Sequence, residues 1–292
     1  MLDYDMPLYR PPSEGNNLII QATLGCSFNQ CSFCSMYKDK TYQQRPLESV
    51  FADIDRAASG WPGATRVFLA DGDALALPSR QLLRILQYLG DAFPHLTRVS
   101  CYATPANIRR KTIAELEQLR EHRLTLLYFG IESGSDLILK KITKGATSRT
   151  IRDSMQKVRD AGVKLSSTVV LGLGGAVYWR EHIDGTIALL NTAPSTYVST
   201  LQLYLEPGVR QEFARKFGEP FKKQDDRGIL SELERLISKL NPPSPVIFRS
   251  NHASNALALA GNLPRDRDRL LADIHRVQSG EKGIRPAFLR GL

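Results

Sequence analysis

Short apolar segments alternate with amphipathic segments between residues 17 and 208. The apolar segments are rich in β-branched residues and nearly continuous, which is typical of parallel strands buried on both faces. The segments between them carry apolar residues at helical spacing. The expected strands are 17–24, 65–71, 97–104, 124–133, 163–173 and 199–208, and the expected helices are 47–59, 78–92, 112–122, 148–160 and around 181–191.

Six strand–helix units predict an α/β fold, in the form of a partial (β/α)6 TIM-like barrel, because a complete barrel of this type has eight units. Beyond Gly208 the alternation ends. A charged helix is expected at 226–240, NPPSP at 241–245 breaks it, and a last helix is expected near 264–278. We therefore expect an N-terminal extension at 1–16, the barrel at 17–209, and a helical C-terminal extension at 210–292 that packs on the barrel.

The overall composition is that of an ordinary globular protein, with 42% hydrophobic and 24% charged residues. No apolar run approaches the length of a membrane span, and the N-terminus has no secretory signal pattern, so we expect a cytoplasmic protein without a membrane partner. The net charge of +9 makes nucleic acid a conceivable partner. The basic residues are dispersed among acids, however, so charge alone does not identify a nucleic-acid binder.

Three of the four cysteines, Cys26, Cys31 and Cys34, lie within nine residues, directly after the first expected strand. In a reducing compartment this clustering indicates metal rather than disulfides. Three thiolates can hold three irons of a [4Fe–4S] cluster and leave the fourth iron open. The alternative is structural zinc, which prefers four closed ligands and would have to recruit a distant residue. The residues by themselves support only a three-cysteine metal site on a strand–helix barrel.

The cysteine loop, followed by strand–helix repeats, resembles the radical S-adenosylmethionine (SAM) superfamily, particularly the branch with the Elp3/MiaB/NifB-type barrel. The pair Cys31-x2-Cys34 and the aromatic Phe33 before the last cysteine match the family pattern. The first gap is a variant, because four residues separate Cys26 from Cys31 instead of three. The resemblance implies an enzyme with a [4Fe–4S] cluster whose open iron binds SAM. Reductive cleavage of SAM would yield a 5′-deoxyadenosyl radical that abstracts hydrogen from a substrate.

The resemblance also implies which residues bind SAM, at the carboxyl ends of the strands where barrel active sites form. Gly72 and Asp73, or Asp71, match a family segment near the methionine moiety. In Gly130-Ile131-Glu132-Ser133-Gly134-Ser135 the acid and hydroxyl match the segment that binds ribose and methionine. Arg149 is the expected partner of the SAM carboxylate, with Lys141 and Lys144 nearby as other basic residues. Leu171 and Gly172 lie at the end of the expected strand 163–173, which resembles the adenine-contacting strand of the family.

The substrate is left open between porphyrinogen oxidation, tRNA modification, and modification of a peptide or small molecule. Tyr102 at the end of the third strand is a candidate substrate contact, as are Asn251, His252 and Asn255 in the C-terminal extension. Only Cys101 remains outside the loop, which argues against an auxiliary cysteine-rich cluster. The family resemblance implies an external one-electron donor such as flavodoxin or ferredoxin. The competing hypothesis is a non-catalytic Fe–S or zinc protein with a basic nucleic-acid-binding surface.

Overall fold

The computed structural model describes residues 2–193 and 195–290. The chain divides into two compact units, each built from separate stretches of sequence. Unit 1 comprises residues 1–29, 36–129 and 156–165, and unit 2 comprises residues 30–35, 130–155 and 166–292. No helix in the described ranges is long and apolar enough to cross a membrane.

Unit 1 is built on parallel strands in the order β1 (Leu18–Gln21), β4 (Arg66–Ala70), β5 (Arg98–Ala103) and β6 (Leu124–Glu132). In the register between β1 and β4, Ile20 lies opposite Leu69. Both residues are fully buried, as the near-continuous apolar pattern of these strands predicts. The short strands β2 (Thr23–Leu24) and β3 (Gln43–Gln44) pair antiparallel beside the start of the cysteine loop.

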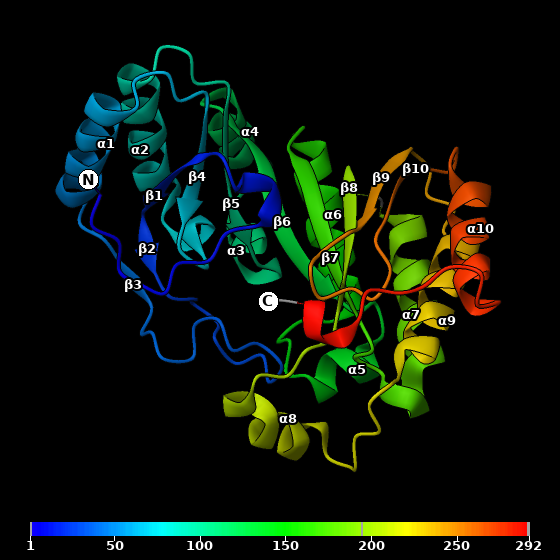
Figure 1. The fold of residues 1–292 in the computed structure, drawn as a ribbon. Coiled ribbons are helices and arrows are strands. Elements are labelled where there is room, and N and C mark those ends of the chain that lie inside the picture. Colours follow the sequence, from blue (N-terminus) through cyan, green and yellow to red (C-terminus); the bar gives the residue numbers. More distant parts are fainter. Residues whose placement is uncertain (1, 194, 291–292) are drawn as a thin grey trace. The chain divides into compact units, whose positions relative to one another are not determined.

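The helices of unit 1 follow the predicted amphipathic segments. They are α1 (Leu47–Gly60), α2 (Ser79–Ala92), α3 (Pro105–Arg110) and α4 (Ile113–Glu121), and α1 and α2 lie side by side (Figure 1). Thr112 and Glu115 form a reciprocal capping box that starts α4. The short helix α3 was not expected from the sequence. It starts at Pro105 behind an N-cap from Thr104, whose side chain accepts a hydrogen bond from the Asn107 amide.

The N-terminal segment is anchored to unit 1 through one buried acid. Glu14 lies in a short 3₁₀ helix (Pro12–Glu14) and is fully buried. Its Oε1 accepts hydrogen bonds from the Arg98 guanidinium at 2.9 Å, the Ser100 hydroxyl at 3.0 Å and the Tyr128 hydroxyl at 2.5 Å. These donors lie on β5 and β6, so the segment before β1 packs against the sheet of its own unit.

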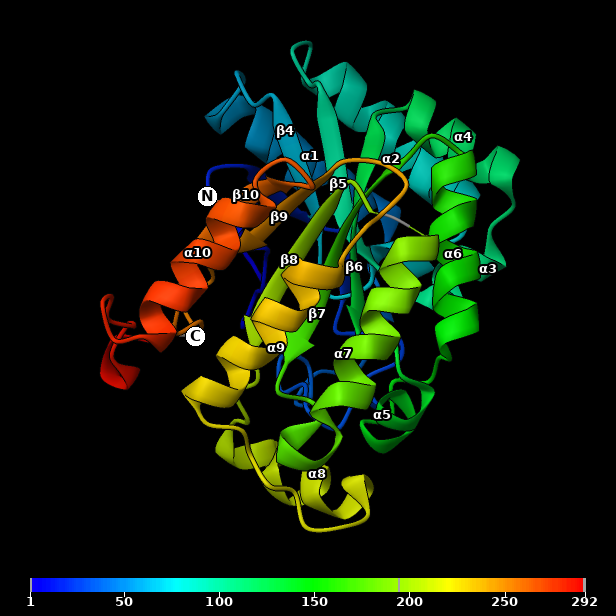
Figure 2. The same ribbon diagram turned by 90° about the vertical axis from the view of Figure 1, so that its right-hand side faces the viewer.

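Unit 2 contains most of β7 (Lys164–Leu171), followed in order by β8 (Tyr197–Gln202), β9 (Val246–Ser250) and β10 (Leu259–Leu263). Its helices are α5 (Asp136–Lys141), α6 (Ser148–Asp160, whose last residues belong to unit 1), α7 (Gly175–Thr192), α8 (Arg210–Phe217), α9 (Asp226–Lys239) and α10 (Arg267–Gln278). Helices α7 and α9 lie side by side (Figure 2), and α10 packs on α9 and β10. Further 3₁₀ turns are Pro207–Val209 and Ala287–Leu289 in unit 2, and Ala74–Ala76 in unit 1.

The described part of the segment beyond 209, which was expected to be helical, contains three α-helices and also contributes two strands to the sheet. β9 pairs parallel with β8, with Val198 opposite Phe248, and β10 pairs antiparallel with β9, with Gly261 opposite Phe248. Val246, Phe248 and Ser250 are buried, with less buried residues between them, which is the two-residue period of a strand. Five residues among polar neighbours form too short a pattern to stand out in the sequence. The helices α5 and α8 were also not expected.

Candidate functional site

The first part of the cysteine loop belongs to unit 1. Cys26 follows Gly25, whose amide donates to Oδ2 of Asp71 at 3.3 Å. Asn29 adopts a left-handed backbone conformation with φ 41°, and its Nδ2 donates to the carbonyl of Tyr37 at 2.6 Å. Asn29 thus turns the chain within the four-residue gap between Cys26 and Cys31. This gap is one residue longer than the family spacing.

The second part of the loop, residues 30–35, belongs to unit 2. The backbone amide and hydroxyl of the buried Ser32 donate to the carbonyl of Ile142 at 2.9 and 3.2 Å. Lys216 on α8 donates to the carbonyl of Gln30 at 3.1 Å. Phe33 packs on an apolar cluster that includes Ile142 and Phe213. The segment that carries Cys31 and Cys34 is therefore held by backbone contacts and by an aromatic anchor.

All four cysteines carry thiols rather than disulfides. Cys101 is fully buried in unit 1, and burial raises the pKa of its thiol, so it is poorly suited to bind metal. No group of three His, Cys, Asp or Glu side chains placed to hold a metal ion occurs within residues 2–193 and 195–290. Cys26 lies in unit 1 and the other two loop cysteines lie in unit 2, so their assignment as cluster ligands rests on the sequence pattern and stays a prediction.

The carboxyl end of β4 carries two buried acids with different partners. Oδ2 of Asp71 accepts from Nζ of Lys40 at 3.0 Å. Asp73 is fully buried and accepts hydrogen bonds from the Ser27 hydroxyl and the Asn107 amide nitrogen. Burial raises the pKa of Asp73 to about 6, although these hydrogen bonds oppose the shift. Because its contacts come from neutral donors, Asp73 is the better suited of the two acids to receive a cationic ligand.

Gly72 between these acids is required by a close contact within unit 1. A Cβ atom at this position would lie 2.4 Å from the ring of Tyr37. Tyr37 is 5% exposed and follows the last cysteine of the loop by three residues. The expectation that Gly72 admits SAM to the backbone stays a prediction, and the structure adds that the glycine admits an aromatic ring from the cysteine loop.

The carboxyl end of β6 carries a buried ion pair in unit 2. Glu132 is 8% exposed and has a positive φ of 62°, an uncommon conformation for a residue with a side chain. Its Oε1 lies 2.8 Å from Nζ of Lys144. Burial opposes the charge on Lys144, but the charges of Glu132, Cys31 and Cys34 outweigh it and raise the pKa of the ammonium. A cation is therefore kept beside the expected ribose-binding acid and near two of the expected cluster ligands.

Ser133 is turned into the interior of unit 2. Its hydroxyl lies 2.8 Å from Nδ1 of the buried His182, and Nε2 of His182 lies 3.1 Å from the carbonyl of Val170. A carbonyl only accepts, so Nε2 carries the proton and Nδ1 accepts from Ser133. Burial lowers the pKa of His182 to about 4, so the ring is neutral at pH 7. Ser133 thus connects the end of β6 to α7, and its expected contact with SAM stays a prediction.

Arg149 lies on the exposed side of the start of α6. Its side chain is 82% exposed, and its guanidinium is 3.8 Å from the carboxylate of Asp153 one helical turn away. In unit 2 the basic residue that contacts Glu132 is instead Lys144.

The carboxyl end of β7 is covered by α9. Leu171 is buried, and Gly172 has a positive φ of 87°. The Gly172 amide donates to Oε2 of Glu232 at 2.7 Å, and Oε1 of Glu232 accepts from Nε2 of Gln224 at 2.6 Å. Glu232 is fully buried, and burial raises its pKa to about 8 against these two hydrogen bonds.

The expected substrate contacts have mixed surroundings. Tyr102 is half-buried and packs edge-on against Phe68 and Tyr128 in unit 1. In unit 2, Asn251 is exposed, and Nδ1 of His252 accepts from the Ser254 amide at 3.1 Å. Asn255 is buried, accepts from the Gln202 amide and donates to the Thr200 carbonyl, both at 2.8 Å. Asn255 therefore completes the hydrogen bonding at the end of β8, and the substrate roles of all four residues stay predictions.

Sequence reasoning did not single out Asn107, His182 or Glu232, and it named Lys144 only as a neighbour of Arg149. Asn107 and His182 each lie on a helix of the strand–helix unit that follows the strand end they support. Glu232 lies 60 residues beyond Gly172. The signal that could have identified Glu232 is a charged residue at an apolar position of the expected helix 226–240.

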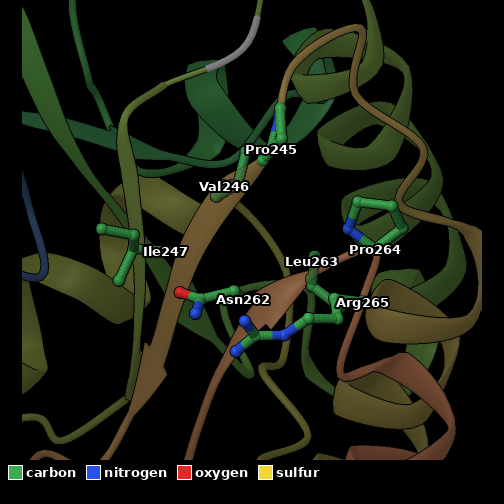
Figure 3. Close-up of a pocket in the computed structure, with 7 residues that line it drawn as sticks. All are labelled: Pro245, Val246, Ile247, Asn262, Leu263, Pro264 and Arg265. Carbon is green, nitrogen blue, oxygen red and sulfur yellow. The ribbon is translucent and has the colours of Figure 1, made fainter.

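A cavity of about 460 Å³ lies away from these strand ends. It is lined by Val246 at the start of β9, by Leu263 at the end of β10, and by Pro264 and Arg265 (Figure 3). Val246 and Leu263 pair at the amino end of the parallel strand β9. The candidate site is expected at the carboxyl ends of the parallel strands, so this cavity is not the candidate site.

Comparison with known proteins finds similarity over most of the strand–helix region. The profile of the radical SAM superfamily matches residues 20–185. A tRNA-2-methylthio-N(6)-dimethylallyladenosine synthase of Roseiflexus sp. is 28% identical over 194 residues, which cover 64% of this chain and 40% of that protein. The heme chaperone HemW of Bacillus subtilis is 22% identical over 184 residues, which cover 61% of this chain and 48% of that protein. The chain thus spans less than half the length of either relative.

Two solved structures show the same fold. Coproporphyrinogen III oxidase (HemN) from Escherichia coli aligns with a TM-score of 0.57 at 15% identity, covering 76% of this chain and 51% of that chain. Methylornithine synthase (PylB) aligns with a TM-score of 0.56 at 15% identity, covering 88% of this chain and 68% of that chain. The prediction of an α/β partial barrel is confirmed by this likeness.

Fold and comparisons together define a class, that of enzymes that bind a [4Fe–4S] cluster and SAM on an α/β partial barrel. The chain belongs to the radical SAM superfamily. Members of this superfamily cleave SAM by a radical route and take their electron from an external donor, and the competing hypothesis of a zinc or non-catalytic protein is not favoured.

Proposed function

We propose that this chain reductively cleaves SAM at a [4Fe–4S] cluster held by Cys26, Cys31 and Cys34, and that the product radical abstracts hydrogen from a substrate C–H bond. The observation that carries the proposal is the three-cysteine loop within the family-matched region, followed by buried acids at the ends of β4 and β6. Three thiolates in nine residues, with no fourth cysteine nearby, fit a cluster that leaves one iron for SAM.

A reduced [4Fe–4S] cluster held by these cysteines would supply the one electron that cleaves SAM into methionine and a 5′-deoxyadenosyl radical. The chain's own residues bind and orient SAM. Asp73, whose contacts are neutral donors, accepts from the SAM ammonium. Glu132 accepts from the ribose hydroxyls, and Leu171 and Gly172 offer the flat strand end to adenine. Phe33 keeps the cysteine segment packed on the apolar cluster of unit 2.

We assign the SAM carboxylate to Lys144 rather than to Arg149. Lys144 has a side chain that is 10% exposed and contacts Glu132, whereas the Arg149 side chain is 82% exposed. A buried ammonium pairs more strongly with a carboxylate than a solvated guanidinium does, because water screens the exposed charge. In this scheme the hydrogen bond between Ser133 and His182 fixes the end of β6 and so helps to position the neighbouring Glu132.

The substrate stays open between a porphyrinogen, a tRNA, and a peptide or small molecule. The similar proteins are a tRNA-2-methylthio-N(6)-dimethylallyladenosine synthase, a heme chaperone and a coproporphyrinogen III oxidase. An auxiliary cysteine-ligated cluster is not supported by this sequence, because Cys101 is its only further cysteine and is fully buried. We place the reaction in the cytoplasm, with flavodoxin or ferredoxin as the electron donor.

The decisive experiment is anaerobic reconstitution followed by reduction with dithionite in the presence of SAM. We expect about four irons per chain and formation of 5′-deoxyadenosine. Cys26→Ala, Cys31→Ala and Cys34→Ala should each abolish both, while Cys101→Ala is the matched control that retains them. Zinc in place of iron, with no 5′-deoxyadenosine from the wild type, would refute the proposal.

A further inference from the structure

The turn after β7 is fixed by contacts from both sides. The carbonyl of Leu171 accepts from the Leu203 amide at 2.9 Å, and the carbonyl of Gly172 accepts from the Gly175 amide at 3.0 Å. A Cβ on Gly172 would lie 3.0 Å from Cδ1 of Ile229 on α9. The positive φ of Gly172 and this tight contact both favour glycine at the position. Helix α9 therefore packs directly on the strand end.

Glu232 supplies the remaining partner of this turn. It is one helical turn beyond Ile229, and its carboxyl group accepts from the amides of Gly172 and Gln224. No cation is among the groups that shift its pKa. A buried acid with only neutral donors is costly compared with an apolar side chain of the same size. Core stability alone gives no reason for an acid at this position.

The position of Glu232 in the sequence is also informative. The family match ends at residue 185, whereas α9 spans Asp226–Lys239. The contact is therefore supplied to a family strand by a segment outside the matched region. The segment Gly172-Leu173-Gly174-Gly175-Ala176 has no acid of its own to receive the Gly172 amide.

We propose that Glu232 is a positioning residue for SAM, which holds the peptide before Gly172 in the orientation that receives the adenine ring. This inference rests on the proposed function. Through the Gly172 amide, Glu232 prevents the strand end from rotating, while the Gly172 carbonyl is held by Gly175. Gln224 holds the second carboxyl oxygen and so keeps Glu232 aimed at the turn.

The test compares Glu232→Met, which keeps the side-chain size but removes the acceptor, with Glu232→Gln, which keeps one carbonyl oxygen. We expect Glu232→Met to raise the Kd of SAM for the reconstituted holoenzyme roughly tenfold. Iron content and the unfolding midpoint should change little. Glu232→Gln should stay within about threefold of the wild type, because the Gln224 amide can rotate to accept from the new side chain.

Hydrogen exchange of the apo protein provides a readout that needs no cluster. The Gly172 amide should exchange about tenfold faster in Glu232→Met, because its acceptor is lost. Glu234→Gln, on the same helix but paired with Gln278 and His275, is the matched control and should leave both readouts unchanged. Gln224→Ala retains the Glu232 side chain but removes the amide that aims it. This variant should give a smaller increase in Kd and serves if Glu232→Met does not fold.

Three outcomes would overturn the inference while the proposed function stands. They are a wild-type Kd in Glu232→Met, a wild-type Kd in Gln224→Ala where Glu232→Met does not fold, and an equal loss in the Glu234→Gln control. If the wild-type holoenzyme neither binds nor cleaves SAM, the proposed function itself fails.

Discussion

The ammonium nitrogen of Lys144 lies 2.8 Å from Oε1 of Glu132 at the buried end of β6. Glu132 occupies a left-handed backbone conformation that costs free energy, which is common where a side chain must be aimed at a ligand. The pair combines an acceptor for hydroxyl groups with a fixed positive charge. This combination fits a ligand that carries both a diol and a carboxylate.

Replacing Lys144 should therefore impair SAM use more than replacing Arg149. We expect Lys144→Met to lower 5′-deoxyadenosine formation about 10- to 100-fold, mainly through a higher KM for SAM, because a charge-assisted hydrogen bond is lost. Lys144→Arg should recover part of the activity. Arg149→Ala is the control and should stay within about twofold, since exposed charges contribute little. The reverse order of the two effects would contradict the assignment.

Gly72→Ala should destabilise unit 1, because the added methyl group would overlap the ring of Tyr37. The expected loss in the free energy of unfolding is about 1–3 kcal/mol, as for other overpacked cores. Denaturant unfolding of Gly72→Ala, Tyr37→Leu and the double variant forms a double-mutant cycle. The double variant should be less destabilised than the sum of the two single changes. Additive effects would show that the ring contact does not limit residue 72.

The buried His182 should make stability depend on acidity in a predictable direction. Burial lowers its pKa to about 4 in the folded chain, below the usual value of 6.5. Its contribution is therefore fully present above pH 6.5 and is lost as the pH falls from 6.5 towards 4. The loss amounts to about 1 kcal/mol between pH 7.5 and pH 5.5. His182→Gln cannot titrate, so urea unfolding at these two pH values should show a flatter dependence than in the wild type. An equal slope in both proteins would contradict the neutral, buried ring.

The anchor at Glu14 is expected to be structural. Glu14→Ala leaves Arg98, Ser100 and Tyr128 without their shared acceptor. We expect a loss of about 3 kcal/mol in the free energy of unfolding, at the low end for a broken buried pair because Arg98 is partly exposed. Glu48→Ala, an exposed acid on α1, is the control and should cost less than about 1 kcal/mol. Similar losses in both variants would show that the buried anchor contributes little.

The sequence was sufficient for the elements whose patterns are long. The expected helix at 148–160 coincides with α6, and the expected strand at 124–133 with β6, because apolar periodicity over nine or more residues is distinctive. The expected strand 199–208 ends earlier, at Gln202, because Pro207 begins a 3₁₀ turn. β9 and β10 are five residues each, and their pairing depends on distant partners that local patterns do not encode.

In the candidate site, the residues marked by a local motif were predictable from the sequence, and those brought in by folding were not. Acids at strand ends, such as Asp73 and Glu132, were identified from local motifs. Their supports were not, because Lys144, His182 and Asn107 reach these ends through folding rather than through neighbouring positions. The role of Arg149 was inferred from its chemistry alone, and exposure at the start of α6 is a tertiary property that chemistry does not reveal.

The pairing of β8 with β9 affects how this chain can be divided for experiments. A fragment ended at residue 209, where the barrel was expected to stop, would lose β9 and leave the amides and carbonyls of β8 without their partners on that side. A bare, apolar strand edge is a template for intermolecular pairing. Such a fragment should be prone to aggregate, so the segment beyond 209 is expected to be needed for solubility as well as for shape.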